Sequence, residues 1–214
     1  MTYIKNKLHN KIFKTLRDRI IHMEYPAGMN LSEKDLCEEF KVSRTPLREA
    51  IRRLEDMGLA SVIPRYGTFV TPININEIRC AFEVKIRLEG LAGEIAAKRI
   101  TADKLEELNA VIRDADTLLK KEKQRNLIEI DTRFHEVIYQ AVQNPILAEL
   151  LENLHSRCAR LWSSTLSEII PTSEIIAQLK EVYGALKKRD ERKAGQLMEN
   201  HVQYFIDKIK TQLL

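Results

Sequence analysis

The chain has 214 residues, of which 44% are hydrophobic and 31% are charged, and its net charge is +4. That composition suits a globular, mostly helical protein of one large domain or two small ones, and the lack of any long apolar run argues against a membrane span. Residues 1–72 hold thirteen Lys and Arg against nine Asp and Glu, whereas the remainder holds twenty-two of each. The positive charge therefore points to a nucleic-acid-binding module joined to a neutral one.

The first predicted element is an amphipathic helix over residues 7–23, because apolar residues recur there at helical spacing. Tyr25-Pro26-Ala27-Gly28 then favours a turn. Ser32, followed three positions later by Asp35, resembles a capping box and predicts a short second helix.

A third short helix is predicted over residues 43–55, and four of its residues are arginines. Ser43 is placed to cap it, and Pro46 lies in the first turn, where a missing N–H costs little. Gly58 is expected to end it.

The pattern then changes to two short apolar runs, residues 59–63 and 68–71, around Pro64-Arg65-Tyr66-Gly67. Such runs predict a β-hairpin. Three helices and a hairpin within about seventy residues indicate a winged helix-turn-helix, and the alternative is a generic small helical domain. The arginines of the third helix and the basic hairpin tip favour the first interpretation.

Residues 73–76 are predicted to be a linker between an N-terminal domain (1–72) and a C-terminal domain (77–214). The C-terminal part has no strand pattern, and its apolar periodicity predicts an antiparallel bundle of about six helices. The fold class is therefore mainly α. The expected helices cover residues 77–99, 101–123, 127–142, 146–166, 173–188 and 191–213.

The N-terminal end of the third helix is the expected DNA-reading surface, because this end points at base edges in helix-turn-helix docking. Arginine can fork onto guanine, and serine or threonine can bond to base or phosphate. The candidate residues here are Ser43, Arg44, Thr45 and Arg48, with Arg52 one turn further on. The alternative is a solvated basic face paired with Glu49 and Glu55.

Residues 31–36, 43–59 and 67–70 together resemble the GntR family of bacterial transcription regulators. The resemblance covers almost all of residues 8–71. It implies that Lys34, Arg44, Thr45 and Arg48 contact DNA, while Tyr66 and Gly67 enter the minor groove. It also implies a homodimer on a short palindromic operator.

In the predicted bundle, Asp131 and His135 are four residues apart and therefore share one helix face with apolar residues. His201 also lies on an inward stripe. Buried carboxylate and imidazole groups need partners, and a metal ion is one way to supply them. The alternative is a set of hydrogen-bonded core residues without metal.

The C-terminal part also resembles the FCD effector domain of the FadR subfamily, through Arg87-Leu88-Glu89, Asp131 with His135, Asn144-Pro145 and His201. Many members bind a divalent metal through one Asp and three His. In this sequence, Leu179 stands where the remaining histidine is expected. Three ligands could still hold Zn or Ni, with weaker binding.

Arg87 shares a helix face with Val84, Leu88 and Leu91, which predicts an inward guanidinium. The functional interpretation is a clamp for the carboxylate of a small effector, and Arg157 or Arg160 is a weaker second candidate. The alternative for Arg87 is an ion pair within the bundle.

The sequence as a whole predicts a cytoplasmic, non-enzymatic DNA-binding regulator that acts as a repressor and is controlled by a small organic acid. Its three cysteines form no C-x-x-C pair, in keeping with reduced thiols. Two alternatives belong to other classes. One is a metal-dependent hydrolase built on the Asp and His residues, and the other is an effector-free dimeric DNA-binding protein.

Overall fold

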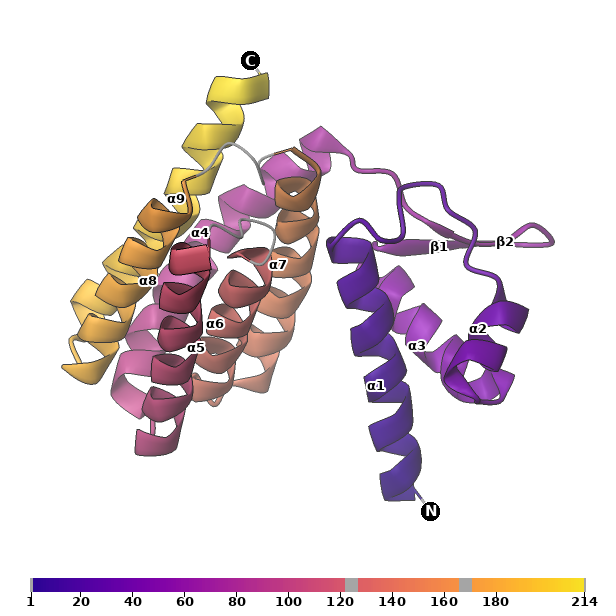
Figure 1. The fold of residues 1–214 in the computed structure, drawn as a ribbon, viewed down its shortest axis with the longest axis horizontal. Coiled ribbons are helices and arrows are strands. Elements are labelled where there is room, and N and C mark those ends of the chain that lie inside the picture. The colour runs from indigo at the N-terminus through magenta and orange to yellow at the C-terminus, as the bar shows by residue number, and fades with distance from the viewer. Residues whose placement is uncertain (1, 122–126, 166–170, 214) are drawn as a thin grey trace. The chain divides into compact units, whose positions relative to one another are not determined.

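The computed structural model describes residues 2–121, 127–165 and 171–213. The chain divides into two compact units, Met1–Ile75 and Asn76–Leu214. Helices account for most of the described residues, as the sequence predicts (Figure 1).

The first unit contains three helices and a hairpin, which confirms the predicted winged helix-turn-helix. The helices are α1 (Thr2–Ile21), α2 (Glu33–Phe40) and α3 (Arg44–Asp56). The hairpin is formed by β1 (Ala60–Ile63) and β2 (Gly67–Val70), which pair antiparallel. α3 packs against α1, α2 and β1.

The predicted helix boundaries in this unit rest on identifiable backbone features. The Ser32 hydroxyl accepts a hydrogen bond from the Asp35 N–H at 3.4 Å, as a capping box requires. Gly58, just beyond the end of α3, has a φ of 68°, which glycine adopts without strain. α1 ends at Ile21, two residues earlier than predicted, and Met23 turns the chain with a φ of 60°.

The core of the first unit lies between the helices and the base of the hairpin. Leu47 and Leu54 of α3 are fully buried, and Phe13 of α1 lies opposite them in the same cluster. Fully burying side chains of this size stabilises the fold by about 1.5–3 kcal/mol each. The core therefore holds α3 rigidly and leaves its other face exposed.

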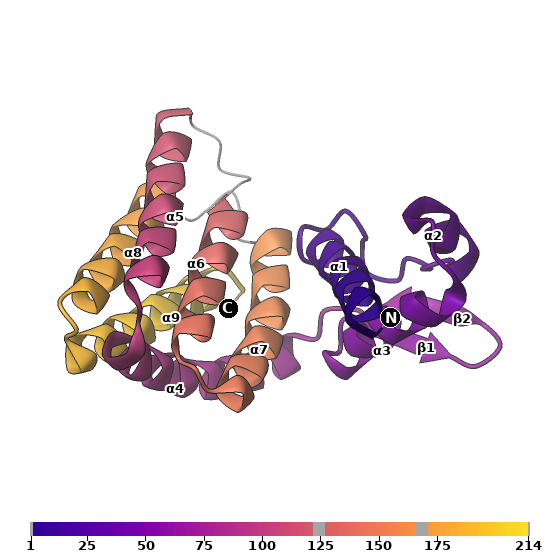
Figure 2. The same ribbon diagram turned by 90° about the horizontal axis from the view of Figure 1, so that it is seen from below.

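The second unit contains the six helices that the sequence predicts, counted over the described residues, and Figure 2 shows them side by side. α4 begins at Ile75, inside the stretch expected to be a linker. α5 packs on α6 and α8, α6 packs on α7, and α8 packs on α9. Their bounds are α4 (Ile75–Arg99), α5 (Ala102–Lys121), α6 (Leu127–Ala141), α7 (Pro145–Thr165), α8 (Thr172–Lys187) and α9 (Glu191–Leu213). None of the helices in the described ranges combines the length and apolar character needed to cross a membrane.

α4 and α9 approach each other closely because glycines line their contact. A Cβ atom at Gly93 would lie 2.7 Å from the Ala194 carbonyl oxygen. A Cβ atom at Gly195 would lie 2.6 Å from Cγ of Glu94 and 3.0 Å from the Gly90 carbonyl oxygen. A larger residue at Gly93 would therefore force the two backbones apart.

Candidate functional site

The first turn of α3 presents polar side chains to solvent. Ser43 occupies the N-cap position with an extended backbone, but its hydroxyl makes no capping hydrogen bond. Ser43, Arg44 and Thr45 are all exposed. This arrangement leaves the three side chains available for contacts outside the protein, at the helix end that reads base edges in helix-turn-helix complexes.

Arg48 lies one turn further along α3 and forms an ion pair with Glu33 at the start of α2. Its Nε donates to both carboxylate oxygens of Glu33 at 3.0 Å, and its side chain is still 57% exposed. The hydrogen bond from Arg48 to Glu33 raises the pKa of the guanidinium. Because the contact uses Nε, the outer edge of the guanidinium remains suited to a fork on guanine.

The other basic residues of the first unit differ in their surroundings. The guanidinium of Arg53 lies 3.8 Å from the centre of the Phe13 ring, and its Nη1 donates to Asn10 Oδ1 at 2.5 Å. Arg53 is therefore held by contacts within the fold. Arg52 on α3 and Lys34 on α2 are exposed.

The tip of the hairpin projects an aromatic side chain. Tyr66 is 77% exposed, and the turn around it uses left-handed backbone at Arg65 (φ 70°) and Gly67 (φ 121°). A Cβ atom at Gly67 would meet the Asn30 side chain at 3.5 Å, an ordinary contact, so the backbone angle is what requires glycine.

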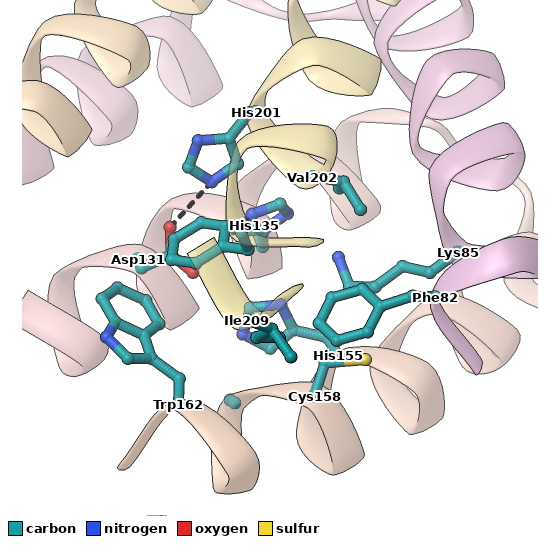
Figure 3. A pocket seen from close by; sticks show the side chains of 12 residues that line it. Phe82, Lys85, Asp131, His135, His155, Cys158, Trp162, His201, Val202 and Ile209 are labelled. Atoms are coloured by element: carbon teal, nitrogen blue, oxygen red, sulfur yellow. Dashed lines mark hydrogen bonds and ion pairs between the residues drawn. The ribbon is translucent and has the colours of Figure 1, made fainter. Parts of the chain in front are cut away.

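A small cavity lies inside the second unit between α4, α6, α7 and α9 (Figure 3). Its volume is about 30 Å³. A cavity of this volume holds an ion or a few water molecules as it stands, so a larger ligand requires side chains of its wall to move. One part of its wall is polar, and Phe82, Trp162 and Phe205 supply an aromatic part.

Asp131, His135 and His201, which the sequence singles out, meet at the polar wall. His201 Nε2 lies 3.0 Å from Asp131 Oδ1, and His135 Nε2 lies 3.8 Å from Asp131 Oδ2. All three side chains are buried. Their donor atoms lie within 4.8 Å of one another, so together they could hold a metal ion.

The structure adds Lys85, Tyr139 and His155, which the sequence interpretation misses. It also adds Glu89, which that interpretation names only as part of the segment resembling the FCD domain. Glu89 is completely buried, and its Oε1 contacts the Lys85 ammonium, the Tyr139 hydroxyl at 2.5 Å and His135 Nδ1 at 3.1 Å. The ring of His155 on α7 lies 4.6 Å from that of His135. The i, i+4 spacing of Lys85 and Glu89 is the one sequence feature that could have indicated the pair.

Burial and mutual contact control the charges in this cluster. Burial alone would raise the pKa of Glu89 and Asp131. The adjacent His135 instead holds both pKa values below the usual range. Lys85 adds to this effect at Glu89, and His201 adds to it at Asp131. Burial lowers the pKa of His155 and His201. It also raises the pKa of the Cys158 thiol to about 12. The two carboxyl groups are therefore ionised, and the thiol stays protonated.

The chemistry of the donors fits a divalent metal with three protein ligands. One carboxylate and two imidazoles match the ligands that zinc takes in sites with an open fourth position. His201 Nδ1 lies 2.8 Å from Gln178 Oε1, and a proton on Nδ1 would leave Nε2 free toward Asp131. Leu179 is fully buried among apolar residues of α8 and contributes no ligand atom.

The prediction that Arg87 faces the interior is wrong. Its side chain is 77% exposed and pairs with Glu199 on α9 at 3.2 Å. α4 carries apolar residues around most of its circumference, so the apolar pattern alone selects the wrong face. The buried face of α4 instead carries Lys85 and Glu89.

The weaker candidates for binding an anion also lie away from this cavity. Arg157 is half-buried beside a separate groove, and its Nε donates to Asn153 Oδ1 at 2.9 Å. Arg160 is buried, which lowers its pKa, but it is not among the residues that line the cavity. The cationic side chain that does line it is Lys85.

Two family models match the chain. Residues 8–70 match the model described as bacterial regulatory proteins, gntR family, and residues 80–204 match the FCD domain. The HTH-type transcriptional repressor RspR of Escherichia coli is 25% identical over 203 residues, covering 95% of this chain and 89% of that protein. The galactonate operon transcriptional repressor of the same organism is 26% identical over 202 residues, covering 85% and 87%.

Solved structures share the fold. The E. coli protein McbR/YncC has a TM-score of 0.83 and 24% identity, covering 97% of this chain and 99% of that chain. A GntR regulator from Rhodococcus has a TM-score of 0.73 and 23% identity, covering 96% and 97%. The relatives are named as transcription regulators rather than enzymes, which argues against the hydrolase alternative. The chain belongs to the GntR family of bacterial transcription regulators and joins a DNA-binding winged helix-turn-helix to an FCD domain.

Proposed function

We propose that this protein is a cytoplasmic transcription repressor that binds a palindromic operator as a homodimer and responds to a small organic acid. The observation that carries the DNA-binding part is the exposed first turn of α3, where the hydroxyl of Ser43 makes no capping bond and Arg44 and Thr45 face solvent. In this proposal, Arg44 and Arg48 read bases, Lys34 and Arg52 contact phosphates, and the wing tip enters the minor groove.

Selection of bound duplexes from a random DNA library tests this function directly. The expected result is a short inverted repeat, because two identical DNA-binding domains related by a two-fold axis bind the same half-site sequence twice. Enrichment of no sequence above the non-specific background would contradict the proposal.

The proposed effector is a small carboxylate bound in the cavity of the second unit. The cavity combines a buried ammonium, a cluster of imidazoles and an aromatic wall, which suits an anion with a short apolar part. A ligand in this cavity controls DNA binding only if its affinity differs between two arrangements of the protein. Two of the residues lining the cavity belong to α4, the helix that follows the first unit in the chain.

We further propose that Asp131, His135 and His201 hold one Zn²⁺ or Ni²⁺ ion. When bound, such an ion would act as a Lewis acid toward the effector's oxygen atoms. The donor set, its burial and its proximity to the cavity support this assignment.

Replacing His201 with glutamine is expected to abolish stoichiometric zinc binding to protein that has been treated with a chelator. The change removes one of three ligands, and two ligands with water bind the ion weakly. In wild-type protein, free Zn²⁺ at 100 times its Kd should stabilise the fold by about 2.7 kcal/mol. Elemental analysis and thermal melting measure the two effects.

His22→Gln is the matched control, because His22 is exposed in the first unit and contacts the Asp18 carbonyl. Zinc binding that survives in His201→Gln at the wild-type stoichiometry and affinity would argue against the metal site.

An exposed apolar face on α4 and α7 is the proposed homodimer surface. Val84, Leu91, Ile146 and Leu150 are between 43% and 72% exposed. Val84 and Leu150 also line a groove on this face, with Arg157 beside them. Exposed apolar side chains that gather around a groove mark protein interaction sites.

Leu150→Glu is expected to weaken the dimer by about 2 kcal/mol or more, because it places a charge at the centre of an apolar contact. Analytical ultracentrifugation over a concentration series measures the dissociation constant. The exposed neighbour Glu149 provides the control, since Glu149→Gln changes no apolar contact. A dimer of unchanged stability in Leu150→Glu would place the interface elsewhere.

A further inference from the structure

Arg160 is a buried cationic residue of α7 that takes no part in the effector cavity. It is 3% exposed, and it is not among the residues that line the cavity. Its Nε and Nη2 atoms are enclosed and have no hydrogen-bond partner among the residues that the structure describes. Buried polar groups in folded proteins are almost always paired, and arginine is rarely buried without a partner. The guanidinium of Arg160 therefore lacks the acceptor that its burial requires.

No carboxylate within the described ranges supplies this acceptor. Burial lowers the pKa of Arg160, and neighbouring charges do not offset that effect. Lys85 is buried to the same degree, but it has the Glu89 carboxylate beside it. An uncompensated charge away from water is costly, so the fold carries this cost unless an anion from outside the chain offsets it.

A second arginine, Arg157, lies one turn before Arg160 on α7. Residues three apart on a helix are neighbours on its surface, with Cβ atoms about 5–6 Å apart. Arg157 is half-buried, and its Nε donates to Asn153 Oδ1 at 2.9 Å, which leaves the donors of its two terminal nitrogens for another acceptor. Two like charges at this spacing repel each other. An anion bound between the two arginines would remove the repulsion and pair the buried guanidinium.

The charge and the donors of the two arginines select the class of anion. A phosphate monoester carries a charge of about −1.5 to −2 at pH 7 and offers three acceptor oxygens. Guanidinium groups bind such oxygens through paired N–H donors. A carboxylate brings one negative charge and would leave one arginine uncompensated. Nη1 of Arg160 is not one of the enclosed atoms, so a phosphate can approach the guanidinium from that side.

We propose that Arg157 and Arg160 form a phosphate-binding site on α7, which takes inorganic phosphate or the phosphate group of a small metabolite. The site is separate from the effector cavity, because His155, Cys158 and Trp162 line the cavity from α7 whereas Arg157 lines a groove on another side of that helix. A bound phosphate pairs the buried charge of Arg160. It therefore stabilises the helical unit, whether or not the effector cavity is occupied.

Isothermal titration calorimetry of the full-length protein, in a buffer without phosphate or sulfate, measures this binding. Inorganic phosphate is expected to bind at one site per chain and to raise the melting temperature, whereas acetate at equal ionic strength has neither effect. Methyl phosphate identifies the source of the phosphate group. Binding at least as tight as that of inorganic phosphate assigns the site to phosphate esters, and weaker binding assigns it to the free ion.

Arg160→Met distinguishes an unpaired charge from a paired one. Replacing an unpaired buried charge with an apolar side chain relieves its cost, so in phosphate-free buffer this variant should melt at or above the wild-type temperature. Its affinity for phosphate should fall roughly tenfold or more, because the charge-assisted hydrogen bonds are lost. Added phosphate should then no longer raise its melting temperature.

Arg157→Gln tests the site independently of the buried residue. It should weaken phosphate binding and leave the melting temperature in phosphate-free buffer unchanged, because Arg157 is half-buried and keeps no buried charge paired. Arg113→Met is the matched control, since Arg113 on α5 is 60% exposed and pairs with Glu106. This control should bind phosphate as the wild-type protein does.

Four results would each overturn the proposal. The first two are failure of the wild-type protein to bind phosphate and a phosphate affinity that persists unchanged in Arg160→Met. The third is an equal loss of affinity in Arg113→Met, which would indicate a general effect of net charge. The fourth is a marked fall in the melting temperature of Arg160→Met without phosphate, which would show that a carboxylate of the protein itself already pairs with Arg160.

Discussion

Replacing Glu89 with alanine is expected to lower the free energy of unfolding of the helical unit by about 3–5 kcal/mol, the usual cost of breaking a buried ion pair from one side. The variant leaves the Lys85 ammonium buried without its carboxylate and removes the acceptor for the Tyr139 hydroxyl. In a unit of this size, the melting temperature should fall by roughly 10 °C or more. Denaturant titration and calorimetry measure the two quantities.

Glu199→Gln is the matched control. Glu199 also pairs with a basic residue of α4, but that residue, Arg87, is 77% exposed. An exposed pair contributes about 0–1 kcal/mol, so this change should be nearly neutral. Equal losses of unfolding free energy in Glu89→Ala and Glu199→Gln would show that burial does not set the strength of the Glu89 contacts.

Arg44→Ala is expected to weaken binding to the selected operator by about 1–3 kcal/mol and to relax the preference at one base pair of each half-site. Arg44 is exposed at the first turn of α3, so its removal leaves no cavity and should not change the melting temperature. Fluorescence anisotropy titrations against the operator and its single-base variants measure both the affinity and the preference.

Arg52→Ala serves as the comparison, because Arg52 is exposed on α3 one turn or more beyond the base-reading end. Loss of a phosphate contact weakens binding to all sequences about equally and lowers the salt slope by about one. Arg44 would not be a base reader if its alanine variant behaved in the same way, with an unchanged base preference.

The sequence predicts the fold well because local patterns determine most of it. Leu47 and Leu54 recur at helical spacing and are buried in α3 as expected. Gly58 marks the end of that helix, and the change to short apolar runs marks the hairpin. These features depend on residues close together in the chain, which is the information that periodicity and capping rules contain.

The cavity is predicted only in part, because its polar wall is assembled from four helices. Asp131 and His135 share one helix face, so their proximity follows from spacing. His155 has no such neighbour on α7, and its place beside His135 depends on how α6 and α7 pack. Lys85 and Glu89 lie on a helix that is apolar around most of its surface, so the pattern did not show which face is buried.

The glycines between α4 and α9 have a mechanical consequence. Gly93 lies against the backbone of Ala194, and Gly195 lies close to the Gly90 carbonyl oxygen, so backbone approaches backbone at these two points. Flexible side chains can absorb a displacement, whereas backbone in direct contact transmits it. α4 and α9 should therefore move together as one rigid body, so a displacement of Lys85 would be accompanied by a displacement of His201. A bulky residue at Gly93 would weaken this coupling between the two helices without changing any residue that lines the cavity.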